Sequence, residues 1–301
     1  MRLLSSSWRL EDARRIRTLH ACIATGLLAP GASRIVGSCL VVRTGSSLRL
    51  ERTAEPDSVQ SEWDLENMRA PDYAGFMANM AREVLDGRKS GPQRCLILGH
   101  GGGTMAADLL TRGDAWRLHV TAVEADADVA CAAQRHFHPH MFAHSEASVE
   151  ARLRLVEADA IDVVTRAATC SRDEASGGAS TPGAEGALGS GNFDVVIEDF
   201  AYEQPGRLGA AFWHDVRTLT AHGGHVLVNT LYEGRPQLDH LASELRAGGW
   251  SDVRQFVDRG LQVEACEVRR SADPSTWCVR DNMIFAAVNQ QGKRRSNTRG
   301  G

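Results

Sequence analysis

The chain has 301 residues, which is enough for one large domain or two. Hydrophobic residues make up 43% of it, so it can bury a sizeable core, and a formal net charge of −4 argues against a nucleic-acid partner. Because no apolar run approaches the roughly 20 residues of a transmembrane helix, we expect no membrane partner either.

The cysteines indicate a reducing compartment. They are odd in number, scattered, and never spaced as C-x-x-C, which argues against a disulfide framework and favours the cytoplasm. The first 30 residues predict a helix and loop that contain five arginines, as in an organelle-targeting segment, although Glu11 and Asp12 count against that function. The seven cysteines are Cys22, Cys39, Cys95, Cys131, Cys170, Cys266 and Cys278.

A small β-element is predicted next, over residues 31–65. Two strand-like segments, 34–42 and 47–52, flank Gly45 and Ser46, which is a hairpin pattern. A helix is expected from Met77 to Leu85, ending near Gly87.

Strand and helix patterns then alternate, which predicts an α/β domain over residues 66–289 with a doubly wound, mostly parallel, seven-stranded sheet. The last strand is expected to be antiparallel. Residues 171–192 are rich in Ser, Gly, Ala and Pro and predict a flexible insertion, and the polar tail 290–301 predicts disorder. The strands are predicted at 95–99, 119–123, 153–156, 193–198, 226–231, 252–257 and 283–288, and the helices at 104–112, 128–137, 160–168, 208–219 and 237–247.

A glycine-rich turn follows the first strand of this domain and predicts a nucleotide-type binding corner. Glycine lets the backbone approach a ligand closely, and the helix that follows offers free N–H groups at its start. The turn is not a P-loop, and as G-x-G-x-x-G it fails at Thr104. A shifted match from Gly101 through Gly103 to Ala106 leaves a dinucleotide ligand open. The turn residues are Gly99, His100, Gly101, Gly102 and Gly103.

Acidic residues stand at the ends of the next strands, where ligands bind in open α/β sheets. A row of carboxylates would repel a pyrophosphate but complements the cationic sulfonium nucleoside S-adenosylmethionine. We expect Glu124 to bind both ribose hydroxyls, Asp159 the exocyclic amine of adenine, and Asp199 the amino group, the sulfonium or the acceptor. Asp126 is a further candidate for cofactor binding. For Asp126 and Asp159, capping of the following helix is an equally good interpretation.

Two neighbouring groups have simpler explanations. Glu198 precedes Asp199, and strand alternation is expected to send its side chain to the other face of the sheet. Alternate histidines at the end of the helix after Asp126 have the composition of a zinc site, but the helix C-terminal dipole also favours histidine, so we predict no metal. These histidines are His136, His138, His140 and His144.

These stretches resemble the spermidine-synthase-like family, a branch of the class I S-adenosylmethionine-dependent methyltransferase fold. The resemblance runs from about residue 40 to 288, through the segments 97–104, 123–126, 157–160, 193–199, 212–229 and 281–286. It implies that Gln60 lies in the N-terminal β-element and contacts the cofactor. It also implies that Tyr73 falls near the position of the family's active-site tyrosine. Tyr73 or Tyr202 would pack against a cationic acceptor. The resemblance also suggests a homodimer.

The sequence departs from the aminopropyltransferases of that family. Their glycine turn carries an aspartate that holds the polyamine, where this chain has Gly102. Their D-S-S-D-P motif is replaced by a segment that keeps Asp199 and has Glu203 displaced. We therefore expect transfer of a methyl group to a small-molecule or protein acceptor. Aminopropyl transfer from decarboxylated S-adenosylmethionine, an NAD-dependent oxidoreductase and a non-catalytic nucleoside-binding protein are the alternatives.

Overall fold

A computed structural model describes residues 27–87, 91–112, 117–143, 151–175, 188, 193–200, 208–231, 235–257 and 282–290. Backbone contacts divide the chain into two compact units. The first comprises Met1–Asn79 with Gly99–Ala158, and the second comprises Met80–Leu98 with Asp159–Gly301. The predictions for residues 1–26, for Tyr202 and for the tail beyond residue 290 lie outside the described residues.

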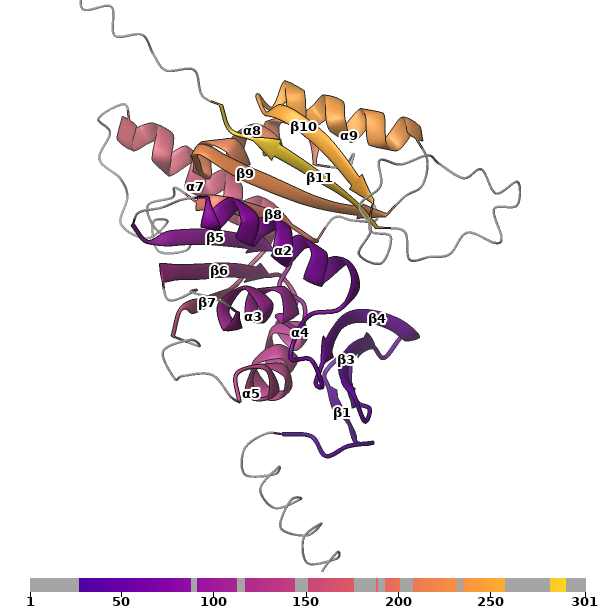
Figure 1. Ribbon diagram of the computed structural model, residues 1–301. Coiled ribbons are helices and arrows are strands. Elements are labelled where there is room, and N and C mark those ends of the chain that lie inside the picture. The colour runs from indigo at the N-terminus through magenta and orange to yellow at the C-terminus, as the bar shows by residue number, and fades with distance from the viewer. Residues whose placement is uncertain are drawn as a thin grey trace, which may run out of the picture. The chain divides into compact units, whose positions relative to one another are not determined.

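The predicted α/β class is confirmed. The main sheet has seven strands in the order β10-β11-β9-β8-β5-β6-β7 (Figure 1). Strand β8 pairs in parallel with β5 and β9, and β6 pairs in parallel with β7. The last strand is antiparallel to both β9 and β10, as expected. The strands are β5 (Gln93–Leu98), β6 (Leu118–Glu124), β7 (Leu153–Glu157), β8 (Phe193–Glu198), β9 (Thr220–Leu231), β10 (Ser251–Val257) and β11 (Asn282–Val288).

The central strands form the core of the sheet. Every residue of β8 is buried, and so are the last four residues of β5. A strand that is covered on both faces reads as a continuous apolar run, which is the pattern that located these two strands in the sequence.

A separate antiparallel sheet of four strands precedes the main one, in the order β1-β2-β3-β4. The expected single strand at 34–42 is wrong: it is broken at Gly37, whose φ of +55° is a left-handed conformation that glycine adopts without strain. One face of the sheet is buried through Val41, Leu50 and Trp63. The strands are β1 (Ser33–Val36), β2 (Cys39–Arg43), β3 (Ser47–Arg52) and β4 (Glu55–Asp64).

The helices follow the predicted order, with three differences, the first of which is that α2 begins at Asp72 and not at Met77. The segment after β6 continues past residue 137, because a π-helical turn precedes a short helix that accepts Pro139 in its first turn. Helix α7 runs to Ala175, so the first five residues of the predicted flexible insertion are helical. The helical elements are α2 (Asp72–Asp86), α3 (Thr104–Thr111), α4 (Ala127–Ala132), η2 (Ala133–Phe137), α5 (His138–Met141), α7 (Ala160–Ala175), α8 (Gly209–Leu219) and α9 (Arg235–Ala247).

Tertiary contacts explain the longer α7. Arg172 of α7 forms an ion pair with Asp215 of α8, with 2.8 Å between Nη1 and Oδ1. Leu188, also within the predicted insertion, is 6% exposed and therefore buried. Composition alone predicted flexibility for residues 171–175, and packing overrides it there; residues 176–187 and 189–192 lie outside the described residues.

No helix within the described ranges is long and apolar enough to cross a membrane.

Asn289, just after β11, ties the end of that strand to the joint between α8 and β9. Its Nδ2 donates to the carbonyl oxygens of Arg217 and Thr220, at 3.2 and 2.8 Å, and the side chain is fully buried. We expect Asn289→Ala to lower the free energy of unfolding by about 2 kcal/mol, because buried carbonyls lose their donor. Chemical denaturation measures this. The exposed Gln290→Ala is the control, and equal stability of both variants would contradict the assignment.

Candidate functional site

The predicted glycine turn connects β5 to α3. Gly99, Gly101 and Gly103 have φ values of +94°, +54° and +80°, which only glycine adopts readily. Gly103 also begins α3, and its N–H donates to the carbonyl of His100 at 2.9 Å. The turn thus has the conformation that its sequence predicted.

Close packing gives a second reason for these glycines. A Cβ on Gly101 would lie 2.6 Å from Oγ of Ser61, and one on Gly102 would lie 2.9 Å from Cε1 of Phe137. Ser61, in β4, also accepts a hydrogen bond from the Gly102 N–H at 2.8 Å. The neighbouring Gln60 lies against the same turn, since its carbonyl oxygen is 3.8 Å from the position of a Cβ on Gly101. The segment that carries Gln60 therefore supports the turn, and its role in binding a cofactor stays a prediction.

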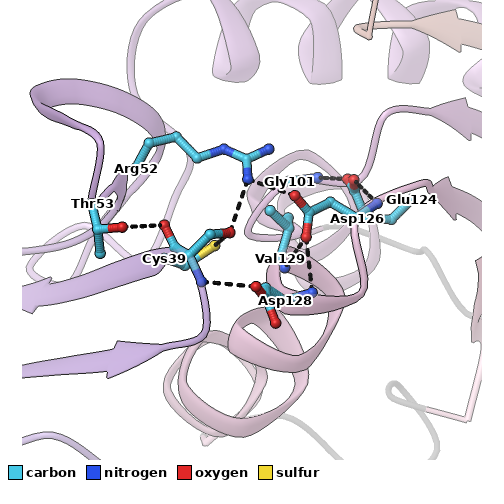
Figure 2. Close-up of polar contacts among 9 residues, drawn as sticks. Cys39, Arg52, Thr53, Gly101, Glu124, Asp126, Asp128 and Val129 are labelled. Atoms are coloured by element: carbon cyan, nitrogen blue, oxygen red, sulfur yellow. Dashed lines mark hydrogen bonds and ion pairs between the residues drawn. The ribbon is translucent and has the colours of Figure 1, made fainter.

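Glu124 lies at the end of β6 and is held at both of its oxygens. Oε2 accepts from the Gly101 N–H at 2.9 Å, and Oε1 accepts from the Asp126 N–H at 3.0 Å (Figure 2). Each carboxylate oxygen has two acceptor positions, so each keeps the capacity to accept from a ligand hydroxyl as well. The turn and the predicted ribose-binding acid thus form one hydrogen-bonded unit.

Asp126 caps helix α4, as one of its two interpretations predicted. Its Oδ1 accepts from the N–H groups of Asp128 and Val129, at 2.9 and 3.3 Å. Its Oδ2 binds Nη1 of Arg52, at 2.5 Å (Figure 2). Burial alone would raise the pKa of Asp126, but the hydrogen bonds from Arg52 and from the backbone hold that pKa below its usual value. Oδ1 of Asp126 is therefore occupied by two backbone N–H groups and Oδ2 by Arg52, and the predicted cofactor contact of Asp126 stays a prediction.

In the second unit, Asp159 also acts as a helix cap. Its Oδ1 accepts from the N–H groups of Ile161 and Asp162, at 2.8 and 3.1 Å, at the start of α7. The residue is exposed. Its predicted contact with adenine stays a prediction.

Asp199 follows β8 and contacts β9. Its Oδ1 accepts from Nδ2 of Asn229, at 2.7 Å. Asn229 is 1% exposed, and its Oδ1 has no hydrogen-bond partner among the described residues. The side chain of Glu198 is fully buried, whereas Asp199 is partly exposed, as expected if strand alternation turns them to opposite faces.

Tyr73 is the second residue of α2 and is partly exposed. Its predicted place beside the acceptor stays a prediction. The other predicted tyrosine, Tyr202, lies outside the described residues.

Three histidines, His100, His138 and His140, are buried, whereas His136 is half-buried and His144 lies outside the described residues. His100, from the glycine turn, and His138 face each other with 3.2 Å between their Nε2 atoms, while His140 Nε2 accepts from the Leu28 N–H at 3.0 Å. Burial lowers the pKa of His100 to about 3, and those of His138 and His140 to about 4. They are neutral at pH 7, so the helix-dipole explanation, which needs a charged ring, is wrong for His138 and His140.

Comparisons place the fold among known structures. No protein-family profile matches the sequence, and no curated protein sequence matches it. The structure is similar to that of a probable spermidine synthase from Corynebacterium glutamicum, with a TM-score of 0.55 and 16% identity over 90% of this chain and 84% of that one. It is also similar to spermidine synthase from Thermotoga maritima, with a TM-score of 0.50 and 12% identity over 86% and 72% of the two chains.

A third match is a spermidine synthase in complex with the transition-state analogue AdoDATO, with a TM-score of 0.50 and 12% identity over 86% of this chain and 71% of that one. At these identities the likeness establishes the fold. The chain has a spermidine-synthase-like fold, as its motifs predicted.

Three residues at these positions were not identified as site residues from the sequence: Arg52, Ser61 and Asn229. Ser61 and Arg52 are 41 and 74 positions away from the residues that they contact, and no local pattern reports such a pairing. Asn229 had a signal that could have found it, since it lies in the strand adjacent to Asp199.

The buried histidines predict a pH-dependent stability. Their folded pKa values lie below the unfolded value of about 6.5, so the unfolded chain binds protons first as the pH falls. Their stabilisation is complete above about pH 6.5 and is lost as the pH falls towards 4, by about 2 kcal/mol per histidine at pH 4.5. Urea titrations at about pH 6.5 and at about pH 4.5 measure this loss of stability. His138→Gln should reduce the loss and the exposed His214→Gln should not, whereas an unchanged loss in His138→Gln would contradict the explanation.

Proposed function

We propose that this protein is a transferase that binds S-adenosylmethionine and transfers its methyl group to an acceptor. The observation that carries the proposal is the carboxylate of Glu124, fixed at both oxygens by the N–H groups of Gly101 and Asp126. A carboxylate held in this way can accept from two adjacent hydroxyls at once, which is what a ribose presents.

The charge of the predicted contacts favours a cationic ligand. Asp199 at the end of β8 and Asp159 before α7 are acids, and the fold places nucleoside ligands at the carboxyl ends of such strands. In the proposal Asp159 accepts from the adenine amine, and Gln60 and the glycine turn lie along the nucleoside. Asp126 contributes by holding the loop through its contacts with the start of α4 and with Arg52.

The side chains of Asp199 and Asn229 favour a methyl acceptor that donates hydrogen bonds from N–H groups. Nδ2 of Asn229 donates to Asp199, so Oδ1 of the same amide points away from Asp199. This buried oxygen accepts no hydrogen bond from the described residues. A buried acceptor without a donor costs about 1–3 kcal/mol, which a bound amine would recover. An amine acceptor, on a small molecule or a protein, satisfies both side chains.

The bound cofactor supplies an activated methyl carbon: a new bond to the acceptor nitrogen forms as the carbon–sulfur bond breaks, and its electron pair goes to sulfur. The residues of this chain then align the acceptor and remove its proton. We assign the proton to the carboxylate of Asp199, and the orientation of that carboxylate to Asn229.

Gly102 favours methyl over aminopropyl transfer. The related aminopropyltransferases carry an aspartate at this position, but here a Cβ would lie 2.9 Å from both Phe137 and Ser61. The space for that aspartate is filled by protein, so a diamine would lack its anchor. Aminopropyl transfer from decarboxylated S-adenosylmethionine remains the second candidate, because the nucleoside contacts would be the same.

Glu124→Gln tests the nucleoside site. Because both oxygens accept from backbone N–H groups, the new NH₂ must face a donor, and one bond is lost. We expect binding of S-adenosylhomocysteine to weaken about 10- to 100-fold by calorimetry. Glu157→Gln, an exposed acid at the end of the neighbouring β7, is the matched control. Equal affinity in both variants would exclude Glu124 from the ribose contact.

Asp199→Asn tests the acceptor side. We expect turnover of an amine found by screening to fall about 100-fold while S-adenosylhomocysteine binds normally, because the variant cannot take the proton. The exposed Asp162→Asn is the control, and release of S-adenosylhomocysteine is the readout. Unchanged turnover would refute this role, and spermidine formed from putrescine would favour the second candidate.

A further inference from the structure

Arg52 is a positive charge among acids. It lies at the end of β3 in the small sheet, and its side chain extends to the loop between β6 and α4 (Figure 2). That loop and the first turn of α4 carry three acids within five residues, Glu124, Asp126 and Asp128. The guanidinium and the Asp126 carboxylate have 33% and 30% exposed side chains, so the pair is shielded in part from water.

The contacts of Arg52 form a chain that reaches Glu124. Its Nη1 donates to Oδ2 of Asp126, the Oδ1 of Asp126 caps α4, and the N–H of Asp126 donates to Oε1 of Glu124. Arg52 thus fixes the residue whose backbone orients the carboxylate, and its charge also interacts through space with the Glu124 carboxylate. The hydrogen bond with Asp126 raises the pKa of Arg52, so this cation stays charged.

The β1–β2 turn adds a second point of attachment. The N–H of Ser38 donates to Oδ2 of Asp128 at 2.8 Å, and Gly37 approaches so closely that a Cβ would lie 2.0 Å from Cγ of Asp128. Arg52 joins the two points, because Nη1 also donates to Oγ of Ser38 at 3.2 Å. Thr53, next in the chain, donates from N and Oγ1 to the carbonyl of Ser38.

We propose that Arg52 is a positioning residue for the nucleoside site: it holds the 124–126 loop so that the carboxylate of Glu124 is set for the ribose. The proposal rests on the proposed function for its ligand, and on the hydrogen-bond chain alone for its mechanism. Arg52 does not touch the ligand, so its effect on affinity passes through Glu124.

Binding in a double-mutant cycle tests this path. We expect Arg52→Ala to weaken binding of S-adenosylhomocysteine about three- to tenfold in the natural background, and less than about twofold when Glu124→Gln is also present. Arg49→Ala is the matched control, because Arg49 lies on the same strand and forms an ion pair with Glu62 that does not reach the loop. Equal weakening in both backgrounds, or the same effect from Arg49→Ala, would overturn the proposal.

Amide hydrogen exchange provides a readout without ligand. Arg52→Ala should speed exchange at the Asp126, Asp128 and Val129 amides about tenfold, and Arg49→Ala should leave it unchanged. If the natural protein fails to bind the nucleoside, the proposed function fails while exchange still decides the role of Arg52. Unchanged exchange would refute that role. Should Arg52→Ala not fold, Arg52→Lys, which keeps the charge and loses the bridge to Ser38, should give a smaller change in the same direction.

Discussion

The hydrogen bonds between the glycine turn and Glu124 are the interaction on which the rest of the site depends. A carboxylate can bind two neighbouring hydroxyls only if both of its oxygens are fixed, and here two backbone N–H groups fix them. The backbone can donate in this way because glycine permits the left-handed conformation at Gly101. The turn thus orients an acid of the next strand, in addition to packing closely against Ser61 and Phe137.

Three residues of the small N-terminal sheet and its turns hold the glycine turn and the loop after Glu124 in place. Ser61 accepts from the turn, Arg52 binds Asp126, and Ser38 binds Asp128. These contacts join the β1–β2 turn, β3 and β4 to the glycine turn and to the start of α4, within the first compact unit. An acidic site therefore contains one fixed cation, which offsets the mutual repulsion of its carboxylates.

Local patterns predicted most of the fold, because apolar runs, glycine turns and strand–helix alternation are local properties. The buried β5 and β8, the glycine turn and the antiparallel last strand were all found in this way. Misjudged features depend on tertiary contacts: the break at Gly37 faces Asp128, and the end of α7 is held by Asp215. The pairing of His100 with His138 joins residues 38 positions apart, so local spacing could not predict it.

The sequence proposed the acids of the candidate site, whose role in binding stays a prediction, and it did not identify the residues that support them. Strand ends identified Glu124 and Asp199, because ligands of such sheets bind there. Arg52, which binds Asp126, and Asn229, which binds Asp199, come from other strands, and only Asn229 had a sequence signal, its place in the strand next to Asp199. The capping of helices by Asp126 and Asp159 shows why an acid after a strand is an ambiguous signal: the same oxygen can serve a helix or a ligand.

The central claim is that the acidic strand ends bind a cationic nucleoside. The most direct test is calorimetric titration of the full chain with S-adenosylmethionine and with NAD at equal ionic strength. The account predicts that S-adenosylmethionine binds at least about tenfold more tightly, because NAD brings a pyrophosphate to carboxylates. Tighter binding of NAD would contradict it.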